Sequence, residues 1–212
     1  MKTDGLIAAL AADTQGVSMP IGRTLGLAVA GGAVAAAIVF AIDIGMRPDV
    51  STAITTPRFL FKLLFTLTLL ASALGLIWNL VRPGAVSSGW LIALAAAPAL
   101  LAIGAVVEML VVPTSDWEHR LVGSNAYMCV ILIPALSALP FAAVLLALRQ
   151  GATSHPVLAG AVAGLVSASI GATLYATHCI DDSPLFIATW YVIAITFMAL
   201  LGALLGARLL RW

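Results

Sequence analysis

The sequence predicts an all-α membrane protein, built as a bundle of six transmembrane helices with a short N-terminal cytoplasmic helix. Of the 212 residues, 62% are hydrophobic and only 9% are charged, and the mean hydropathy is +1.13. A soluble domain carries about 25% charged residues, so this chain cannot cover a water-facing surface. As whole-chain functions, a soluble enzyme, a nucleic-acid-binding protein and a disordered regulator are therefore excluded.

The apolar residues gather into six long runs separated by polar breaks. Each run is close to the ~20 residues that cross ~30 Å of hydrocarbon as a helix. The runs are Thr24–Ile42, Phe59–Asn79, Trp90–Val112, Tyr127–Leu148, Pro156–Thr177 and Pro184–Ala207. The chain thus divides into an N-terminal segment, residues 1–22, and a six-helix domain, residues 23–212.

The distribution of Lys and Arg predicts the orientation. An even number of spans places both termini on one side. If that side is the cytoplasm, the inner cations are Lys2, Arg23, Arg82, Arg149, Arg208 and Arg211, and the outer ones are Arg47, Arg58, Lys62 and Arg120. The excess inside has the sign of the positive-inside rule. We therefore expect cytoplasmic N- and C-termini.

Small residues recur four positions apart at Gly22/Gly26, Gly160/Gly164 and Gly202/Gly206. This spacing lets two membrane helices approach closely. Such pairs serve ordinary packing within one chain or, as the alternative, the seam of a homodimer.

The two cysteines are predicted to lie at the same, outer end of the bundle. Cys129 is near the start of the fourth run and Cys179 follows the end of the fifth. Either residue alone fits a small apolar core side chain. As a pair, they fit a disulfide, which is permitted outside the cytoplasm, or ligands for a soft metal ion. The spacing leaves these alternatives open.

The stretch from His178 to Pro184 is the most polar connection between two runs. Asp181 or Ser183 can cap the last helix, with Pro184 in its first turn. That capping role does not explain His178 and Cys179. A metal site would draw its ligands from Cys129, Cys179, His178, His119, Asp181 and Asp182. Without a Cys-x-x-Cys or His-x-x-x-His motif, we expect no resident metal, only a transient heavy-metal ion.

Four further charged residues fall near the outer membrane surface: Asp43, Arg58, Lys62 and Glu108. They fit mutual ion pairs, with the two cations extending toward water. The alternative is an outer cavity that admits an anion or a metal ion to the thiols.

The first residues predict a short amphipathic helix. Thr3 can be its N-cap, Asp4 suits the positive end of the helix dipole, and Leu6, Ile7 and Leu10 share one side. This apolar stripe fits either the inner membrane surface or a groove on a partner protein.

The Lys2-Thr3-Asp4-x-Leu6-Ile7 opening, the six runs, Cys129 and the stretch from His178 to Phe186 resemble the NrsF family. These negative regulators of sigma F are anti-sigma factors of the bacterial inner membrane. The resemblance implies that the N-terminal segment holds an extracytoplasmic-function sigma factor, without direct contact to nucleic acid. It also implies that Cys129 and Cys179 help to sense heavy-metal or oxidative stress. The sequence departs from the expected pattern at Gly5, where a polar or acidic residue would fit.

Two other classes of membrane protein compete with this interpretation. A small transporter or metal-permeation protein would use Asp43, Glu108 and the cysteines as a pathway, but few ionisable residues continue it through the inner halves of the runs. A thiol oxidoreductase would need a Cys-x-x-Cys pair, which the chain lacks. We therefore expect a regulator without enzyme activity.

Overall fold

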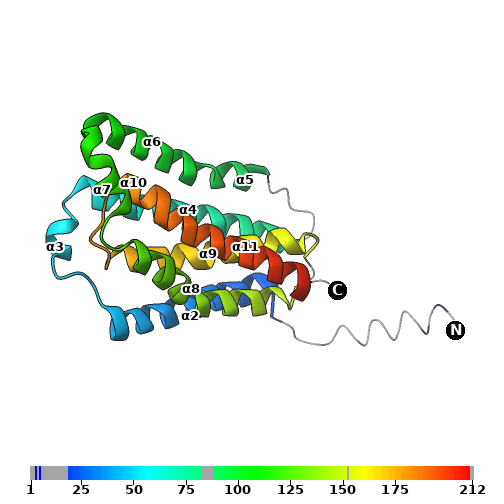
Figure 1. The fold of residues 1–212 in the computed structure, drawn as a ribbon. Coiled ribbons are helices and arrows are strands. Elements are labelled where there is room, and N and C mark those ends of the chain that lie inside the picture. The colour runs from blue at the N-terminus through cyan, green and yellow to red at the C-terminus, as the bar shows by residue number, and fades with distance from the viewer. Residues whose placement is uncertain (1–2, 4, 6–18, 83–87, 152, 211–212) are drawn as a thin grey trace.

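The described part of the computed structural model, residues 3, 5, 19–82, 88–151 and 153–210, is helical and contains six helices long and apolar enough to cross a membrane. They run back and forth side by side (Figure 1). The predicted fold class is confirmed. Of the predicted N-terminal helix, Thr3 and Gly5 are helical and exposed, while Asp4, Leu6, Ile7 and Leu10 lie outside the described residues.

Each predicted run corresponds to one observed span, and most of the boundaries differ by only a few residues. The spans are built from α2 (Ile21–Val39) with η1 (Phe40–Ile44), α4 (Pro57–Leu80), α5 (Ser88–Leu94) with α6 (Ala96–Val111), α8 (Ala126–Leu148), α9 (Pro156–Ala176), and α10 (Pro184–Phe186) with η3 (Ile187–Tyr191) and α11 (Val192–Leu209). Three short elements in the connections were not predicted: α3 (Val50–Ala53), η2 (Thr114–Asp116) and α7 (Trp117–Val122).

The third span is interrupted, whereas the sequence predicts one continuous helix. The helix α5 ends at Leu94 and α6 begins at Ala96. Pro98 explains the break, because proline has no N–H to donate to the carbonyl of Leu94 and its ring clashes with that carbonyl.

The helix α9 forms the centre of the bundle and packs against α4, α8 and α11. Most of its side chains are Ala, Gly, Ser or Val, and two thirds of the residues in its membrane-spanning window are buried. The helix α6 lies at the edge (Figure 1) and buries only Ala97, Leu101 and Glu108. Small side chains thus let three helices surround α9 closely, while α6 is attached more loosely.

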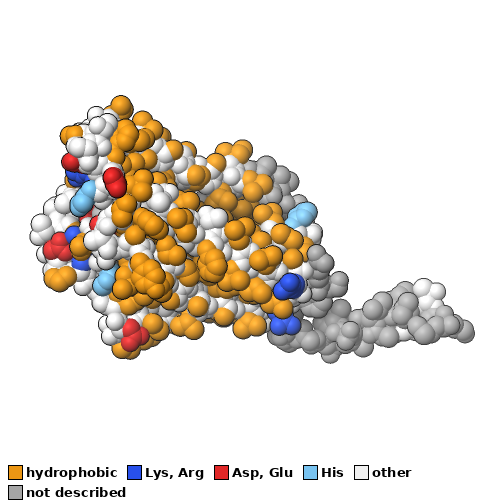
Figure 2. Space-filling view, viewed as in Figure 1, with side chains coloured by type: hydrophobic (Ala, Val, Ile, Leu, Met, Phe, Trp, Pro, Cys, Tyr) orange, Lys and Arg blue, Asp and Glu red, His pale blue; other side chains and the backbone are white. Residues whose placement is uncertain are grey.

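The bundle has two ends of different charge. We call the end that holds Ile44, Pro57, Val111, Ala176 and Pro184 the cysteine end, and the opposite one the terminal end. Figure 2 shows hydrophobic side chains over the middle and charged ones at the two ends. All acidic residues of the described part lie at the cysteine end, whereas the terminal end carries only arginines among its described charged residues.

Glycines bring α9 and α11 into backbone contact. A Cβ atom on Gly160 would overlap the carbonyl oxygen of Gly202, and one on Gly164 would overlap that of Met198. The pair Gly22/Gly26 faces Trp78 of α4. All three predicted small-residue pairs therefore face neighbouring helices of the same chain.

We expect Gly160→Val to prevent stable packing of α9 on α11. The new side chain would meet backbone atoms of α11, which cannot rotate away, so the cost should reach or exceed the ~1–3 kcal/mol typical of an overpacked core. Gly31→Val is the matched control, because nothing lies within 4 Å of a Cβ atom on this helical glycine. Thermal unfolding in detergent measures both variants. Equal midpoints would contradict the close contact.

Candidate functional site: a buried thiol pair

The structure places Cys129 and Cys179 together inside the cysteine end. Cys129 lies in the first turn of α8, and Cys179 lies three residues after α9 ends at Ala176. Both are free thiols with an exposed fraction of 0%. Both side chains belong to one buried cluster, close enough for each thiol to influence the other. Because both sulfurs are enclosed, anything that reacts with them must open or penetrate the surrounding shell.

Aromatic side chains close one side of the thiol pair. Tyr175 accepts a backbone hydrogen bond from Cys179 at 2.9 Å, and its ring centroid lies 6.1 Å from that of Tyr191 and 5.8 Å from that of His178. Among the described residues, the buried hydroxyl groups of Tyr175 and Tyr191 have no hydrogen-bond partner. The thiols therefore lie, enclosed from solvent, near two buried phenol groups whose O–H donors are unused.

Lys62 lies directly beneath the segment Thr177–Ser183, which we call the thiol loop. Its side chain is 0% exposed. The ammonium group donates to the carbonyl of Cys179 at 2.8 Å and to the carbonyl of Asp181 at 3.3 Å, and it forms a salt bridge with the Asp182 carboxylate. The buried ammonium group thus has two hydrogen-bond acceptors and one negatively charged partner. The prediction that Lys62 extends toward water is wrong, because the thiol loop supplies its partners inside the protein.

Arg47 is the second cation on the thiol loop. Its Nε and one terminal nitrogen donate to the two carboxylate oxygens of Asp49, each at 2.7 Å, and its other terminal nitrogen donates to Asp182 at 2.8 Å. The guanidinium group lowers the pKa of Asp49 through the hydrogen bonds. Arg47 and Lys62 together balance the charges of Asp49 and Asp182. The charged network that holds the loop is thus neutral as a group.

The environment favours ionisation of Cys179. The hydrogen bond from Cys129 is the main cause that lowers the pKa of the Cys179 thiol, and the positive charge of Lys62 adds to it against the opposing effect of burial. The thiolate is the reactive form of cysteine. The lowered pKa thus favours the thiolate form at Cys179.

The thiol loop is bonded to the first span at the cysteine end of the bundle. The His178 Nδ1 atom donates to the carbonyl of Gly45 at 3.0 Å, and the Arg47 N–H donates to the carbonyl of Thr177 at 3.1 Å. Since a carbonyl only accepts hydrogen bonds, Nδ1 carries the proton. Gly45 directly follows the π-helical turn η1, so a displacement of the loop would act on the helix that leads to the N-terminal segment.

Asp181 fastens the same loop to the start of α8. Its carboxylate accepts hydrogen bonds from the backbone N–H groups of Ser124 at 3.1 Å and Asn125 at 2.8 Å, and from the Asn125 side chain at 3.0 Å. On the other side, Ser183 caps the last span by accepting from the N–H of Leu185 at 3.3 Å, as predicted for this position. The loop thereby connects Cys179 to the helix that carries Cys129.

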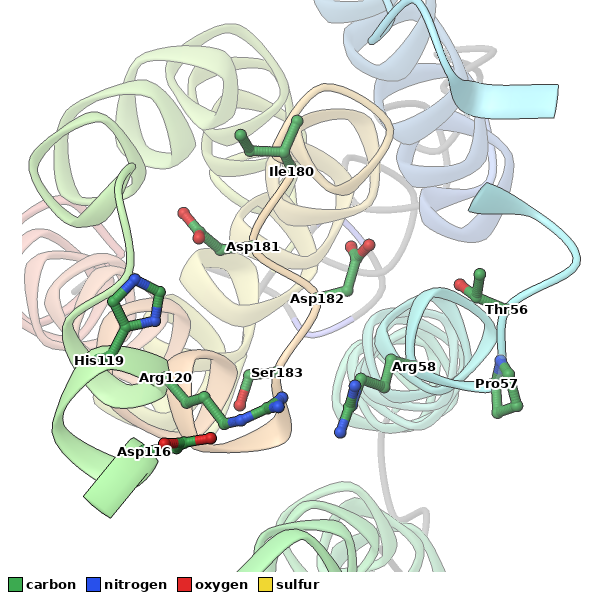
Figure 3. A pocket seen from close by; sticks show the side chains of 10 residues that line it. All are labelled: Thr56, Pro57, Arg58, Asp116, His119, Arg120, Ile180, Asp181, Asp182 and Ser183. Carbon is green, nitrogen blue, oxygen red and sulfur yellow. The ribbon is translucent and has the colours of Figure 1, made fainter. Parts of the chain in front are cut away.

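The six residues named as possible metal ligands occupy separate places. Cys129 and Cys179 are together, but His178 is turned to Gly45, Asp181 to α8, and Asp182 to Lys62 and Arg47. His119 instead lines a pocket at the cysteine end (Figure 3). Across the described ranges, no three His, Cys, Asp or Glu residues gather closely enough to hold a metal ion. A metal bound here would have the two sulfurs as its starting ligands.

An open pocket of about 770 Å³ lies over the thiol loop at the cysteine end (Figure 3). It is lined by Thr56, Pro57, Arg58, Asp116, His119, Arg120, Ile180, Asp181, Asp182 and Ser183. Behind it, the buried Glu108 accepts from Arg58 at 3.2 Å and from Arg120 at 3.1 Å. The predicted pairing of Arg58 with Glu108 is confirmed. Asp43 is exposed and has no salt bridge to another described residue, contrary to the expected pairing.

Sequence reasoning missed Arg47, Asn125, Tyr175 and Tyr191. A signal was present for Arg47: two adjacent acids, Asp181 and Asp182, follow a helix that ends inside the protein, and such buried acids require cations at the same end. No comparable signal marked the tyrosines, whose relation to the sulfurs depends on the rotation of α9 and the last span about their axes.

The fold and the site define a class of protein: a helical protein that crosses the membrane several times and holds a buried thiol pair at one end. The chain belongs to the NrsF family, described as negative regulators of sigma F, because the family model matches residues 10–212. A probable anti-sigma-F factor of Azospira oryzae is 33% identical and the anti-sigma-F factor of Caulobacter vibrioides is 34% identical, each over the full length of both chains. These names describe regulators, not enzymes. No solved structure matches the chain.

Proposed function

We propose that this protein is an anti-sigma factor of the inner membrane, which retains an extracytoplasmic-function sigma factor at its cytoplasmic end and releases it when the thiol pair reacts. Two findings together support the proposal. Two full-length relatives are named as anti-sigma-F factors, and the two cysteines of this chain meet in one buried site.

The charge distribution supports an orientation with the terminal end in the cytoplasm. Among the described residues, that end carries Arg23, Arg82, Arg149 and Arg208 and no acidic residue, while all described acids lie at the cysteine end. Positive residues favour the cytoplasmic side of a membrane. The thiol pair then faces the periplasm, where oxidants and metal ions from outside the cell arrive first.

The N-terminal segment, residues 1–22, is the proposed sigma-docking element, and residues 23–212 are the proposed sensor. The apolar stripe of Leu6, Ile7 and Leu10, with Thr3 and Asp4 before it, suits a helix bound in a groove of the partner. This segment leads directly into α2, whose far end is bonded to the thiol loop through Gly45 and Arg47. One helix therefore joins the sensing end to the docking segment.

The chemistry of the signal follows from two adjacent thiols. The Cys179 thiolate can attack one oxygen of a hydroperoxide. The O–O bond breaks, an alcohol or water leaves after taking up a proton, and Cys179 becomes a sulfenic acid. The Cys129 sulfur then displaces hydroxide, so that a disulfide and water form after proton transfer. A thiophilic metal ion would instead replace the thiol protons and bind the sulfurs.

Either reaction disturbs the packing around the thiols. A disulfide draws the sulfurs to about 2.05 Å and fixes the torsion about the bond, and a metal ion separates them. The backbone of Cys179 is held by Lys62 and Arg47, so its displacement shifts the thiol loop and the end of α2 attached to it. Shifting the ratio of bound to free sigma factor from 99:1 to 1:99 requires a difference of about 5.5 kcal/mol between the two states of the sensor. Thiol oxidation or metal ligation can supply a free energy of that order.

We expect co-purification of the sigma factor to require the N-terminal segment. The full-length protein should retain its sigma factor, whereas a form without residues 2–15 should lose it while remaining inserted in the membrane. A Leu6→Asp, Ile7→Asp double variant should also fail, because two charges in the stripe would oppose burial in an apolar groove. Exchange of Ala8 and Ala9 for serine is the milder control. Unchanged capture by the shortened protein would contradict the docking role.

A further inference from the structure

We propose that the pocket at the cysteine end binds a phosphate-type oxyanion through Arg58 and Arg120. The two arginines come from different elements, α4 and α7, and both line the pocket, with their guanidinium groups on the same side of it (Figure 3). The pocket volume of about 770 Å³ lies within the roughly 300–1,000 Å³ typical of small-ligand sites.

The two guanidinium groups have hydrogen-bond donors to spare. Arg58 gives two nitrogens to Glu108, at 3.2 Å each, and Arg120 gives one at 3.1 Å. Each guanidinium has five N–H donors, so most of them have no partner among the described residues. The Arg58 and Arg120 side chains are 44% and 29% exposed, which keeps these donors accessible from the pocket. Planar forked donors of this kind match the geometry of phosphate oxygens.

Two of the three carboxylates in the pocket wall already have partners. Asp181 accepts from the backbone and side chains of Ser124 and Asn125, and Asp182 is held by Lys62 and Arg47. A cation entering the pocket would have to displace these partners, whereas an anion meets open donors. Asp116, at the wall, is the exception: it accepts only from Ser115 among the described residues and repels an anion. The pocket thus favours an oxyanion of moderate affinity.

Two sources can supply the same chemistry. One is a free phosphate in the water outside the membrane, and the other is the phosphodiester of a lipid headgroup in the adjoining leaflet. Pro57 and the half-exposed Ile180 add apolar surface to the pocket lining, which the acyl chains next to a lipid headgroup could contact. A bound oxyanion would compete with Glu108 for the guanidinium groups of Arg58 and Arg120. Glu108 is one of three buried residues of α6, so binding would loosen the attachment of this edge helix.

Calorimetric titration of the purified full-length protein in maltoside detergent tests the site. Inorganic phosphate and dioctanoyl phosphatidylglycerol are the two probes. At least one should bind saturably, and Arg58→Gln or Arg120→Gln should weaken that binding about tenfold, the loss expected for a charged hydrogen bond of about 1.4 kcal/mol. Arg149→Gln, an exposed arginine at the terminal end, is the matched control and should bind as the unchanged protein does.

The Glu108→Gln variant distinguishes a direct effect on oxyanion binding from a loss of folded protein, because it should strengthen binding. It removes the competing carboxylate and leaves two partly exposed arginines that water can solvate, so binding of the oxyanion should become tighter by several fold. Saturable binding of phosphate identifies a free anion as the ligand, and binding of the lipid alone identifies a headgroup. Absence of binding by both probes, equal binding by the arginine variants, or weaker binding by Glu108→Gln would overturn the proposal. The readout involves no sigma factor, so it is independent of the proposed anti-sigma function.

Discussion

Replacing either Cys129 or Cys179 with serine should abolish the response to stress as completely as replacing both. The two sulfurs share one buried site, and a disulfide or a shared metal ion needs both of them. Independent sites would give effects that add, whereas residues that act as one unit do not. The measurement is the induction of a sigma-dependent promoter by cadmium or a hydroperoxide in cells that carry each of the four forms.

Two further variants control this experiment. Alanine at the same positions should give the same loss, because the effect follows from the missing sulfur and not from the new hydroxyl group. His178→Asn tests the ligand set: it should matter little if the thiols form a disulfide, and as much as the cysteines if a metal ion is held with His178. Normal induction in the double serine variant would refute the thiol sensor.

Lys62→Met should destabilise the protein by about 3–5 kcal/mol, the usual cost of removing one partner of a buried ion pair. The ammonium group has three partners and no exposure to solvent, so its loss leaves the carbonyls of Cys179 and Asp181 without their donor and Asp182 with Arg47 alone. Thermal and denaturant unfolding in detergent measure the loss. We expect the thiols to become accessible to a maleimide reagent at the same time, because the thiol loop is no longer held.

A double-mutant cycle isolates this ion pair. Asp182→Asn combined with Lys62→Met should cost less than the sum of the single changes, since the double variant buries no unpaired lysine. Arg58→Gln is the comparison for a partly exposed ion pair, and its cost in stability should stay within about 1 kcal/mol. A Lys62→Met variant as stable as Arg58→Gln would show that the buried cation does not hold the loop.

Much of the architecture could be predicted from apolar run length, because a membrane accepts few structures besides helices of about 20 residues. The meeting of Cys129 and Cys179 at one end also follows from counting spans. The break before Ala96 shows where such counting fails: Leu94 and Pro98 lie within an uninterrupted apolar run, and hydropathy does not register a missing N–H group.

The partners of the charged residues could not be predicted, because they depend on loops folded back into the protein. Arg58 and Lys62 lie one turn apart on the same helix. Yet Arg58 stays half-exposed while it pairs with the buried Glu108, and Lys62 is fully enclosed by the thiol loop. His178 follows the end of α9 as expected, but its ring turns to Gly45 instead of joining Cys179. Helix periodicity does not constrain such contacts, since they are set by the path of a short connection.

The most direct test of the account follows release of the sigma factor from the reconstituted complex. The full-length protein with its bound sigma factor is placed in lipid nanodiscs, exposed to hydrogen peroxide or cadmium, and the sigma factor in solution is quantified while mass spectrometry reports the state of both thiols. We predict release in step with modification of Cys129 and Cys179, and retention in the double serine variant. Full modification of both thiols with the sigma factor still bound, or equal release from the double serine variant, would contradict the account.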